Sequence, residues 1–336
     1  MSKPKPYTLG SLLEAYFHQR LIAQRKSSPR TVAAYRDSLR LLLTFVAEKK
    51  NRPPARLSIE DLDRDTVLAF LDSLEAARKN SIRTRNARRA AIRSFMSYVA
   101  LCDPASLGVV QRVLAIPSKR HERKVVSYLR QEQLDAILAV PDRATPPGRR
   151  DYALLLFLAR TGARVSEATA LNRTDLRLDK PGHVLLRGKG DKQRAVPLAE
   201  DVRQTLTEWL QERGLNANEG RPVFVNARGK RLSRFGVNYI LERVTSAAAS
   251  RCADLERQSV SPHVLRHTLA MQLLQSGVDL TTIQSWLGHA GVETTHHYME
   301  ADLEMKRQAL GKCQFPEGAV ERFEPDDELL AMLARL

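Results

Sequence analysis

The stretch from Ser261 to Tyr298 constrains the fold most, because it holds the clearest local signals for where helices begin and end. Ser261 followed by Pro262 is typical of a helix start, with a hydroxyl N-cap and proline at the first helical position. Gly277 and Gly288 are typical C-terminal stops for two successive helices. We therefore expect two short helices in a row, with the polar side chains of the stretch near their ends.

These helix ends bring basic side chains toward a phenol. His263 and Arg266 lie three residues apart, on one face of the first turn of the first helix. His289 comes directly after the second stop, and Tyr298 follows nine residues later. Two imidazoles and a guanidinium beside a tyrosine predict a site that binds a phosphate next to a nucleophile.

The charge of the chain favours nucleic acid as its partner. The 336 residues carry a net charge of +16, and residues 1–102 alone hold 20 Lys and Arg against 9 Asp and Glu. Such a field attracts a polyanion. The longest apolar run, Tyr152 to Ala159, is too short to span a bilayer, so no membrane partner is expected. A chain of this length has room for two domains, each with its own core.

The three cysteines, Cys102, Cys252 and Cys313, are odd in number and far apart in the sequence. They predict no disulfide framework and no zinc cluster, and they suit a reducing cytoplasm. The first residues lead into no hydrophobic signal region, so export is not expected. The expected location is therefore the cytoplasm.

Helical spacing of apolar residues predicts an all-helical first domain, residues 1–102. Its expected helices are Leu9–Leu21, Pro29–Val46, Leu62–Leu74 and Ser81–Ala100. No acidic residue lies between Ala76 and Leu101, and arginines fall near one face of the last helix. Such a stripe is either a solvated surface or a row of phosphate contacts along a duplex, and we expect the second. The candidate DNA-binding residues are Arg78, Arg85, Arg89 and Arg93.

Residues 103–127 are the candidate linker, with Pro104, Pro117 and a basic cluster that includes Lys119 and Arg120. A linker that crosses DNA between two domains would be basic, so Lys119 and Arg120 are also candidate DNA-binding residues. The alternative is a soluble hinge without DNA contacts, and the sequence leaves both interpretations open.

The second domain, residues 128–312, combines helices with a β-hairpin. Two short strands, Val184–Arg187 and Arg194–Pro197, are joined by Gly188–Gln193, which places Lys189 at the hairpin tip. A further candidate strand is Val223–Val225. Besides the two helices after Ser261, the expected helices are Gln131–Val140, Asp151–Arg160, Ser166–Asn172, Ala199–Arg213, Arg234–Ala247 and Asp302–Leu310.

Together these motifs resemble the tyrosine recombinase (phage-integrase) family. His263-x-x-Arg266, Leu287-Gly288-His289 and Tyr298 stand in the family's order and at its spacing. The run TGARVSE, Thr161–Glu167, resembles the segment with the family's first catalytic arginine, and GKGDK, Gly188–Lys192, resembles its lysine-bearing hairpin. The resemblance covers residues 7–310 and implies a mainly α fold with a small β-sheet. It implies a two-domain C-clamp, made of a helical SAM-like core-binding domain and a catalytic domain.

Side-chain chemistry and the resemblance together give the arginines a role. Arg164 and Arg266 would neutralise the non-bridging oxygens of a phosphate as it becomes pentavalent, because a guanidinium is a planar fork of donors that stays protonated. A surface salt bridge is the commoner use of a lone arginine. Within these motifs we expect the catalytic role, with Glu167 orienting the basic groups from one helical turn away.

The resemblance implies Tyr298 as the nucleophile, although a tyrosine taken alone is more often a core aromatic. A phenol has an ordinary pKa of about 10 and needs help in losing its proton. His263 matches the family's base-like position, and His289 matches the position that hydrogen-bonds the scissile phosphate. Lys189 would be the general acid that protonates the departing 5′ oxygen.

His263 and His267 stand at positions i and i+4, a spacing that metal ligands on a helix also use. No glutamate follows His263 as in a zincin, and no cysteine lies near. We therefore expect no metal site, and we expect His267 to be a buried structural histidine. Because a covalent link would store the phosphoester energy, no ATP and no other cofactor should be needed.

The expected function is site-specific recombination of double-stranded DNA through a 3′-phosphotyrosyl intermediate. By the family pattern the protein would act as a homo-oligomer, a dimer on each site and a tetramer in synapsis, alone or with a related recombinase. The chain opens on the helical domain, without the arm-binding domain of lambda-type integrases. Its segment after Tyr298 is longer than in compact Xer-type recombinases, which favours a mobile-element integrase or transposase over Xer-type dimer resolution. The resemblance also implies action in the bacterial cytoplasm, in association with the nucleoid. Two other classes stay open: a type IB-like topoisomerase and a DNA-binding regulator without catalysis.

The last residues, 313–336, reverse the sign of the chain, with six Asp and Glu against two Arg. Leu329, Leu330, Leu333 and Leu336 form an apolar stripe on a predicted helix of about three turns, which is marginal alone in water. It needs a surface to pack on, in the same protomer or in a neighbour. The family resemblance favours exchange between protomers.

Overall fold

The computed structural model describes residues 7–120, 127–188 and 192–288. The chain divides into two compact units, Met1–Lys124 and Val125–Leu336. Each unit buries an apolar core of its own. The architecture is mainly helical with one small sheet, as the sequence predicts. None of the described helices is long and apolar enough to cross a membrane.

Helices make up the first unit, and side-chain caps mark where the main ones start. The hydroxyl of Ser28 accepts from the amide of Thr31 at 3.2 Å, and Pro29 occupies the first turn. The elements are α1 (Leu9–Ala15), η1 (Tyr16–Gln24), α2 (Pro29–Lys50), η2 (Pro54–Arg56), η3 (Glu60–Leu62), α3 (Arg64–Ala76), α4 (Ile82–Cys102), η4 (Pro104–Ser106) and α5 (Leu107–Leu114). The element η1 is a π-helix, so the first predicted helix runs on to Gln24 with a wider turn.

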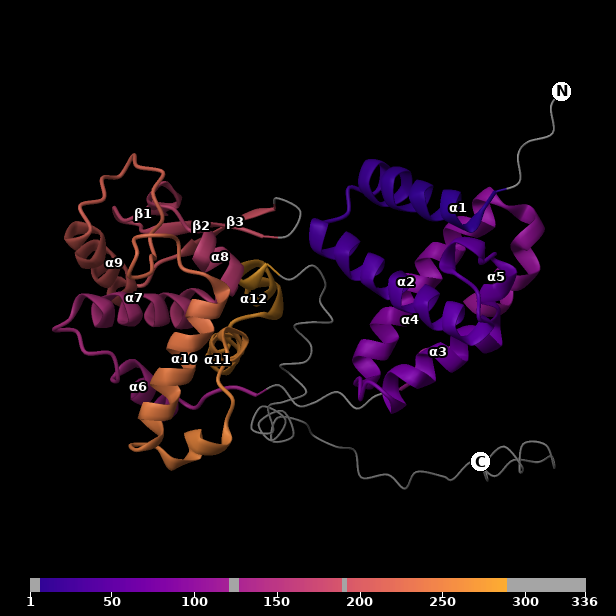
Figure 1. Ribbon diagram of the computed structural model, residues 1–336. Coiled ribbons are helices and arrows are strands. Elements are labelled where there is room, and N and C mark those ends of the chain that lie inside the picture. Colours follow the sequence, from indigo (N-terminus) through magenta and orange to yellow (C-terminus); the bar gives the residue numbers. More distant parts are fainter. Residues whose placement is uncertain (1–6, 121–126, 189–191, 289–336) are drawn as a thin grey trace, which may run out of the picture. The chain divides into compact units, whose positions relative to one another are not determined.

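The helix α4 is the centre of this unit, since α2, α3 and α5 all pack against it (Figure 1). Its buried side chains include Ile92, Phe95 and Met96. The ring of Tyr16 meets that of Phe95 edge to face, with centroids 5.4 Å apart, and its hydroxyl donates to Ser94 at 2.7 Å. The apolar side of the basic helix therefore faces the core, as its spacing predicts.

The helix α5 lies inside the stretch that the sequence assigns to a linker. Its Val113, and Ile116 just beyond it, are buried in the core of the first unit. Two arginines of α4 hold its carboxyl end: Arg89 donates from Nε to the carbonyl of Ile116 at 2.7 Å, and Arg93 donates to that of Leu114. The expected linker is therefore wrong in its first half, because an apolar helix face there belongs to the first core.

The second unit consists of helices and three short strands, which follow one another along the chain within residues 176–197 (Figure 1). Its elements are α6 (Gln131–Leu138), α7 (Pro146–Thr161), α8 (Val165–Ala170), η5 (Arg173–Asp175), β1 (Leu176–Arg177), β2 (His183–Arg187), β3 (Gln193–Pro197), α9 (Glu200–Glu212), α10 (Arg234–Ala249), η7 (Ala253–Arg257), α11 (Pro262–Gln275) and α12 (Leu280–Leu287). The helix α7 is central, and α9 and α11 pack on it. Its long apolar run is buried on all sides, which is why that run shows no helical alternation.

The sheet is antiparallel, in the order β1-β2-β3. Val184 of β2 pairs with Val196 of β3, and both are fully buried. Leu186 pairs with Arg194, so the alternation of the strand directs Arg194 to the same face as Val196. The strand β1 was not predicted, and around residues 223–225 the structure has only isolated bridges, Val225 to Arg231 among them.

Candidate active site and DNA-binding surface

The site is built where α7 ends and α8 begins. Gly162 closes α7 in the left-handed region, at φ +63, which favours glycine. A Cβ at this position would lie 2.7 Å from Leu287 Cδ2 and 3.1 Å from Leu269 Cδ2. The glycine therefore permits both the turn and the close approach of α11 and α12. Arg164 follows as the N-cap residue of α8.

Glu167 is the anionic centre of the site. Its carboxylate accepts from the backbone amide of Arg164 at 2.8 Å and from Arg164 Nη1 at 2.9 Å. Arg194 of β3 adds two further bonds, one to each carboxylate oxygen, both at 2.8 Å. Burial alone would raise the pKa of Glu167, but the bonds from Arg194 and Arg164 outweigh it and hold the pKa below its ordinary value.

Arg266 lies on α11, whose start is capped by Ser261 as the sequence predicts. Its guanidinium is buried, at 3% exposure, and Nη1 donates to the carbonyl of Gly162 at 2.6 Å. Nη2 donates to the carbonyl of Leu287. Arg266 thus ties the end of α7 to the end of α12.

Three arginines converge on the carboxyl end of α12. Trp286, Leu287 and Gly288 each present a carbonyl, and each carbonyl accepts from a different arginine. Arg194 Nε donates to the carbonyl of Trp286 at 2.9 Å, and Arg164 Nη2 donates to the carbonyl of Gly288 at 2.9 Å. Arg266 donates to the carbonyl of Leu287, between them. The negative end of a helix dipole stabilises cations, so this end can gather guanidinium groups that would otherwise repel one another.

His263 lies in the first turn of α11. Partial burial lowers the pKa of His263 below its ordinary value, and the charges of Arg266 and Arg164 lower it further. Arg234, at the start of α10, contributes in the same direction. The imidazole is therefore neutral at pH 7 and is able to accept a proton.

Burial, with His263 and Arg266 nearby, lowers the pKa of His267 to about 4, so this side chain is also neutral at pH 7. His267 is half-buried and not fully buried as expected, and its structural role stays a prediction. Among the described residues, no group of three or more His, Cys, Asp or Glu side chains is placed to hold a metal ion.

Of the predicted site residues, the structure brings together Arg164, Glu167, His263 and Arg266. Lys189, His289 and Tyr298 lie outside the described residues, as do residues 313–336. The residues directly before Lys189 and His289 are described, and both lie at the site. A Cβ on Gly188, next to Lys189 in sequence, would lie 3.5 Å from Glu167 Oε1. Gly288, which precedes His289, lies against Arg194.

Two basic residues of the candidate site, Arg194 and Arg234, are not predicted by the sequence motifs. A signal for Arg194 is present in the strand, because it stands two residues before the buried Val196 and shares its face. An arginine at an inward position of a strand needs a buried partner. Arg234 has no such signal, since its electrostatic effect on the pKa of His263 depends on how α10 packs.

The expected stripe of arginines on α4 is only partly present. Arg85 is buried, with Nε 2.8 Å from Glu75 Oε1 and Nη2 3.6 Å from Asp72 Oδ1. The expectation that Arg85 lies on a DNA-facing surface is therefore wrong, because carboxylates of α3 compensate its charge. Lys119 also pairs with Glu75, at 2.7 Å. Arg78 and Arg120 are exposed.

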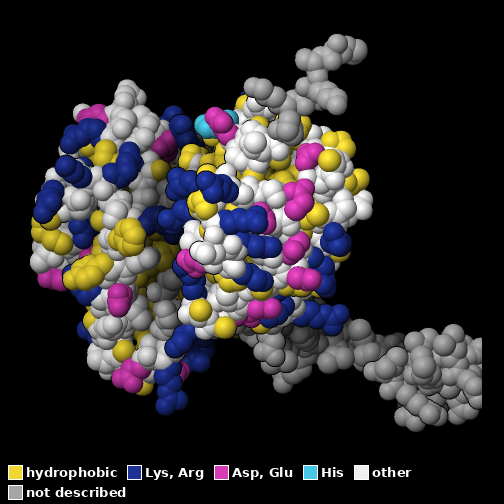
Figure 2. Space-filling model, turned by 45° about the vertical axis from the view of Figure 1, so that its right-hand side comes forward, with side chains coloured by type: hydrophobic (Ala, Val, Ile, Leu, Met, Phe, Trp, Pro, Cys, Tyr) yellow, Lys and Arg dark blue, Asp and Glu magenta, His cyan; other side chains and the backbone are white. Residues whose placement is uncertain are grey.

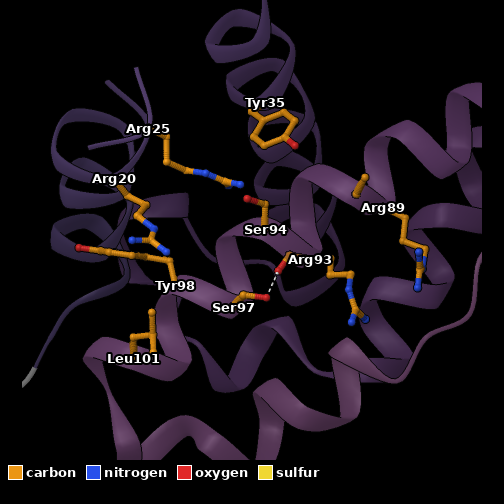
Figure 3. A pocket seen from close by; sticks show the side chains of 10 residues that line it. Arg20, Arg25, Tyr35, Arg89, Arg93, Ser94, Ser97, Tyr98 and Leu101 are labelled. Atoms are coloured by element: carbon orange, nitrogen blue, oxygen red, sulfur yellow. Dashed lines mark hydrogen bonds between the residues drawn. The ribbon is translucent and has the colours of Figure 1, made fainter. Parts of the chain in front are cut away.

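Arg89 and Arg93 instead line a basic pocket in the first unit (Figure 3). The pocket is a hollow of about 430 Å³, and Arg20 and Arg25 line it from the side of η1. The remaining lining residues are Tyr35, Ala90, Ser94, Ser97, Tyr98 and Leu101, with no carboxylate among them. Figure 2 shows Lys and Arg side chains, in dark blue, over much of the surface in view.

Comparison with protein families assigns both units. Residues 127–305 match the model described as the phage integrase family, and residues 13–101 match the one described as the phage integrase N-terminal SAM-like domain. The chain belongs to the phage integrase family of tyrosine recombinases. The family that the sequence motifs predict is thereby confirmed, and so is the mainly helical fold.

Among its tyrosine recombinase relatives is a Sinorhizobium fredii protein named "Putative integrase/recombinase y4rC", 46% identical over 99% of both chains. Tyrosine recombinase XerC of Pelobacter propionicus is 34% identical over 88% of this chain and 93% of its own. The crystal structure of the XerH site-specific recombinase, in a post-cleavage complex with a palindromic difH substrate, has a TM-score of 0.70. It is 25% identical, over 86% of this chain and 81% of that one.

Proposed function

We propose that this tyrosine recombinase cuts and rejoins double-stranded DNA at specific sites, with Tyr298 as its nucleophile. The observation that carries the proposal is the cluster in which Arg164, Glu167 and Arg266 meet at the end of α12, with His263 beside it. Two guanidiniums next to a neutral imidazole form a suitable binding site for a scissile phosphate.

In the proposed reaction the Tyr298 hydroxyl attacks the phosphorus and gives up its proton to His263. A 3′-phosphotyrosyl bond forms, and the 5′ oxygen departs with a proton from Lys189. Arg164, Arg266 and His289 bind the non-bridging oxygens, whose charge grows in the pentavalent state. A 5′ hydroxyl of the partner duplex then attacks the phosphotyrosine, so the tyrosine is restored without ATP.

The first unit would hold the duplex as the core-binding domain. The basic pocket supports this part of the proposal, because four arginines and several hydroxyl side chains line one hollow without a carboxylate. Arg20 and Arg25 carry the argument furthest, since the guanidiniums of Arg89 and Arg93 also donate to backbone carbonyls. Such a surface suits phosphate groups. We assign Arg20 and Arg25 to the DNA-binding surface in addition to Arg78, Arg89, Arg93, Lys119 and Arg120.

Replacing both Arg20 and Arg25 by Gln should weaken binding to all sequences alike. The slope of log binding constant against log salt should fall by about 1 for each phosphate that the variant no longer neutralises. Arg64→Gln is a matched control, since Arg64 is an exposed arginine of the same unit that pairs with Asp65 at 3.2 Å. Gel-shift titrations at several salt concentrations measure the slope. An equal fall in slope for Arg64→Gln would contradict the assignment.

For the biological role we propose integration or excision of a mobile element. The support is the higher identity to the y4rC protein than to XerC, 46% against 34%. Xer-type dimer resolution is the alternative. The active oligomer would be a dimer on each site and a tetramer when two sites are paired.

Strand exchange between two duplexes tests the function. Two labelled duplexes of different length, each with a DNA repeat that flanks the gene, should yield recombinant lengths, and the yield should persist in EDTA. A type IB-like topoisomerase would relax supercoiled DNA without recombinants, and a regulator would shift the duplexes without cutting them. Either result, or a requirement for Mg²⁺, would contradict the proposal. Exchange only between chromosomal dimer-resolution sites would favour the Xer-type role.

A further inference from the structure

Arg194 enters the site from an unusual position, the core-facing side of a strand. It pairs with Leu186 across β2 and β3 and shares the face of the fully buried Val196. Its side chain is 11% exposed. A charge this deep requires specific partners, since desolvation would otherwise be costly.

The partners of Arg194 come from two other segments of the site. Its two terminal nitrogens bind the two oxygens of Glu167, at 2.8 Å each, in the bidentate geometry that is strongest for this pair. Its Nε binds the carbonyl of Trp286 at 2.9 Å. A Cβ on Gly288 would lie 3.0 Å from Arg194 Cδ, so the end of α12 rests directly on this side chain.

The geometry points to Arg194 as a positioning residue for the recombination reaction, an inference that rests on the proposed function. Each segment it joins adjoins a proposed catalytic residue. The strand β3 leaves the hairpin that carries Lys189, Glu167 holds Arg164, and Gly288 precedes His289. One guanidinium therefore fixes the positions of β3, α8 and the end of α12 relative to one another.

Arg194 also leaves Arg164 available to the substrate. Glu167 is almost fully buried and needs more than one donor. Arg194 binds both carboxylate oxygens, so the guanidinium of Arg164 donates only one N–H to Glu167 and one to the carbonyl of Gly288. A guanidinium has five N–H groups, which leaves the others for the substrate. Without Arg194, the carboxylate would draw Arg164 more fully to itself and away from the phosphate.

Arg194→Lys tests the inference, because lysine keeps the charge and loses the fork. We expect single-turnover cleavage of a suicide duplex to slow about tenfold or more, with half-site affinity within about twofold of wild type, since Arg194 would touch no DNA. Arg187→Lys is the matched control, because Arg187 lies on β2 with a side chain 64% exposed. It should cleave at the wild-type rate. Arg194→Gln is a second variant, and thermal melting shows which of the two is folded.

Two further measurements distinguish a positioning role of Arg194 from a merely structural one: a double-mutant comparison with Glu167→Gln and the pH profile of cleavage. If Arg194 acts through Glu167, Arg194→Lys should cost much less in a Glu167→Gln background than in the wild type. The acid limb of the cleavage pH profile should also shift to higher pH in Arg194→Gln, because Glu167 loses bonds that lower its pKa. Wild-type cleavage by a folded Arg194→Lys, or an equal cost in both backgrounds, would overturn the inference. Failure of the wild type to cleave would instead overturn the proposed function.

Discussion

Protein with Tyr298→Phe should bind its DNA site as tightly as the wild type and form no covalent adduct on a nicked suicide duplex. The substitution removes one oxygen and keeps the ring, so any loss reports on the hydroxyl as nucleophile. In the wild type, the short fragment beyond the nick diffuses away after cleavage, and the 3′-phosphotyrosyl link stays trapped. A denaturing gel with labelled DNA measures the adduct, and a gel shift measures binding.

Tyr239→Phe is the matched control for this experiment. Tyr239 lies on α10 and is 66% exposed, so it loses the same atom at a surface position of the catalytic unit. It should trap DNA at the wild-type level. Trapping by Tyr298→Phe at a similar level would show that another group is the nucleophile.

Arg164→Ala should slow cleavage by about a hundredfold or more, the scale of removing one donor from a transition state. Half-site binding should change by only a few fold, because this arginine is one of many groups that bind phosphates. Arg160→Ala is a matched control on α7, since Arg160 pairs with Asp201 at 3.2 Å and is not part of the cluster. Single-turnover cleavage and gel-shift affinity are measured for both. Equal slowing by the two variants, or a loss of binding as large as the loss of rate, would contradict the role of Arg164.

Arg164 separates catalysis from stability better than Arg266 does. Arg266 is buried and serves the carbonyls of Gly162 and Leu287, so Arg266→Ala would leave both without that donor. An unsatisfied buried group costs about 1–3 kcal/mol. A slow Arg266→Ala variant would therefore report on folding and on catalysis together.

Helix ends were predictable from the sequence because caps are local. Ser28, Ser81 and Ser261 accept from amides three residues on, and Gly288 closes α12 in the left-handed region, at φ +64. Each signal acts within a single turn, so no knowledge of packing was needed. The strand β1 is only two residues long and has no local signal of this kind.

The pattern of charges along the sequence predicted the DNA-binding surface less well, because the ion-pair and hydrogen-bond partners of an arginine lie on other helices. Arg85 stands in a stretch free of acidic residues, yet Glu75 and Asp72 of α3 reach it. Arg89 and Arg93 donate hydrogen bonds to backbone carbonyls at the end of α5 and just beyond it. The sequence assigns this helix to a linker, because proline and basic residues lie on either side of it. One-dimensional spacing shows which charges share a helix face, and not what packs against that face.

By itself the sequence determined the mainly helical class and the family, and it predicted Arg164, Glu167, His263 and Arg266 as a set, because motif spacing and local capping are properties of neighbouring residues. Only the tertiary structure decided how that set is held. Arg194 joins Glu167 to the end of α12, and the partners lie 27 and 92 positions away along the chain. Such contacts depend on how β3, α8 and α12 pack around one buried carboxylate, where low solvent access makes each unpaired charge costly.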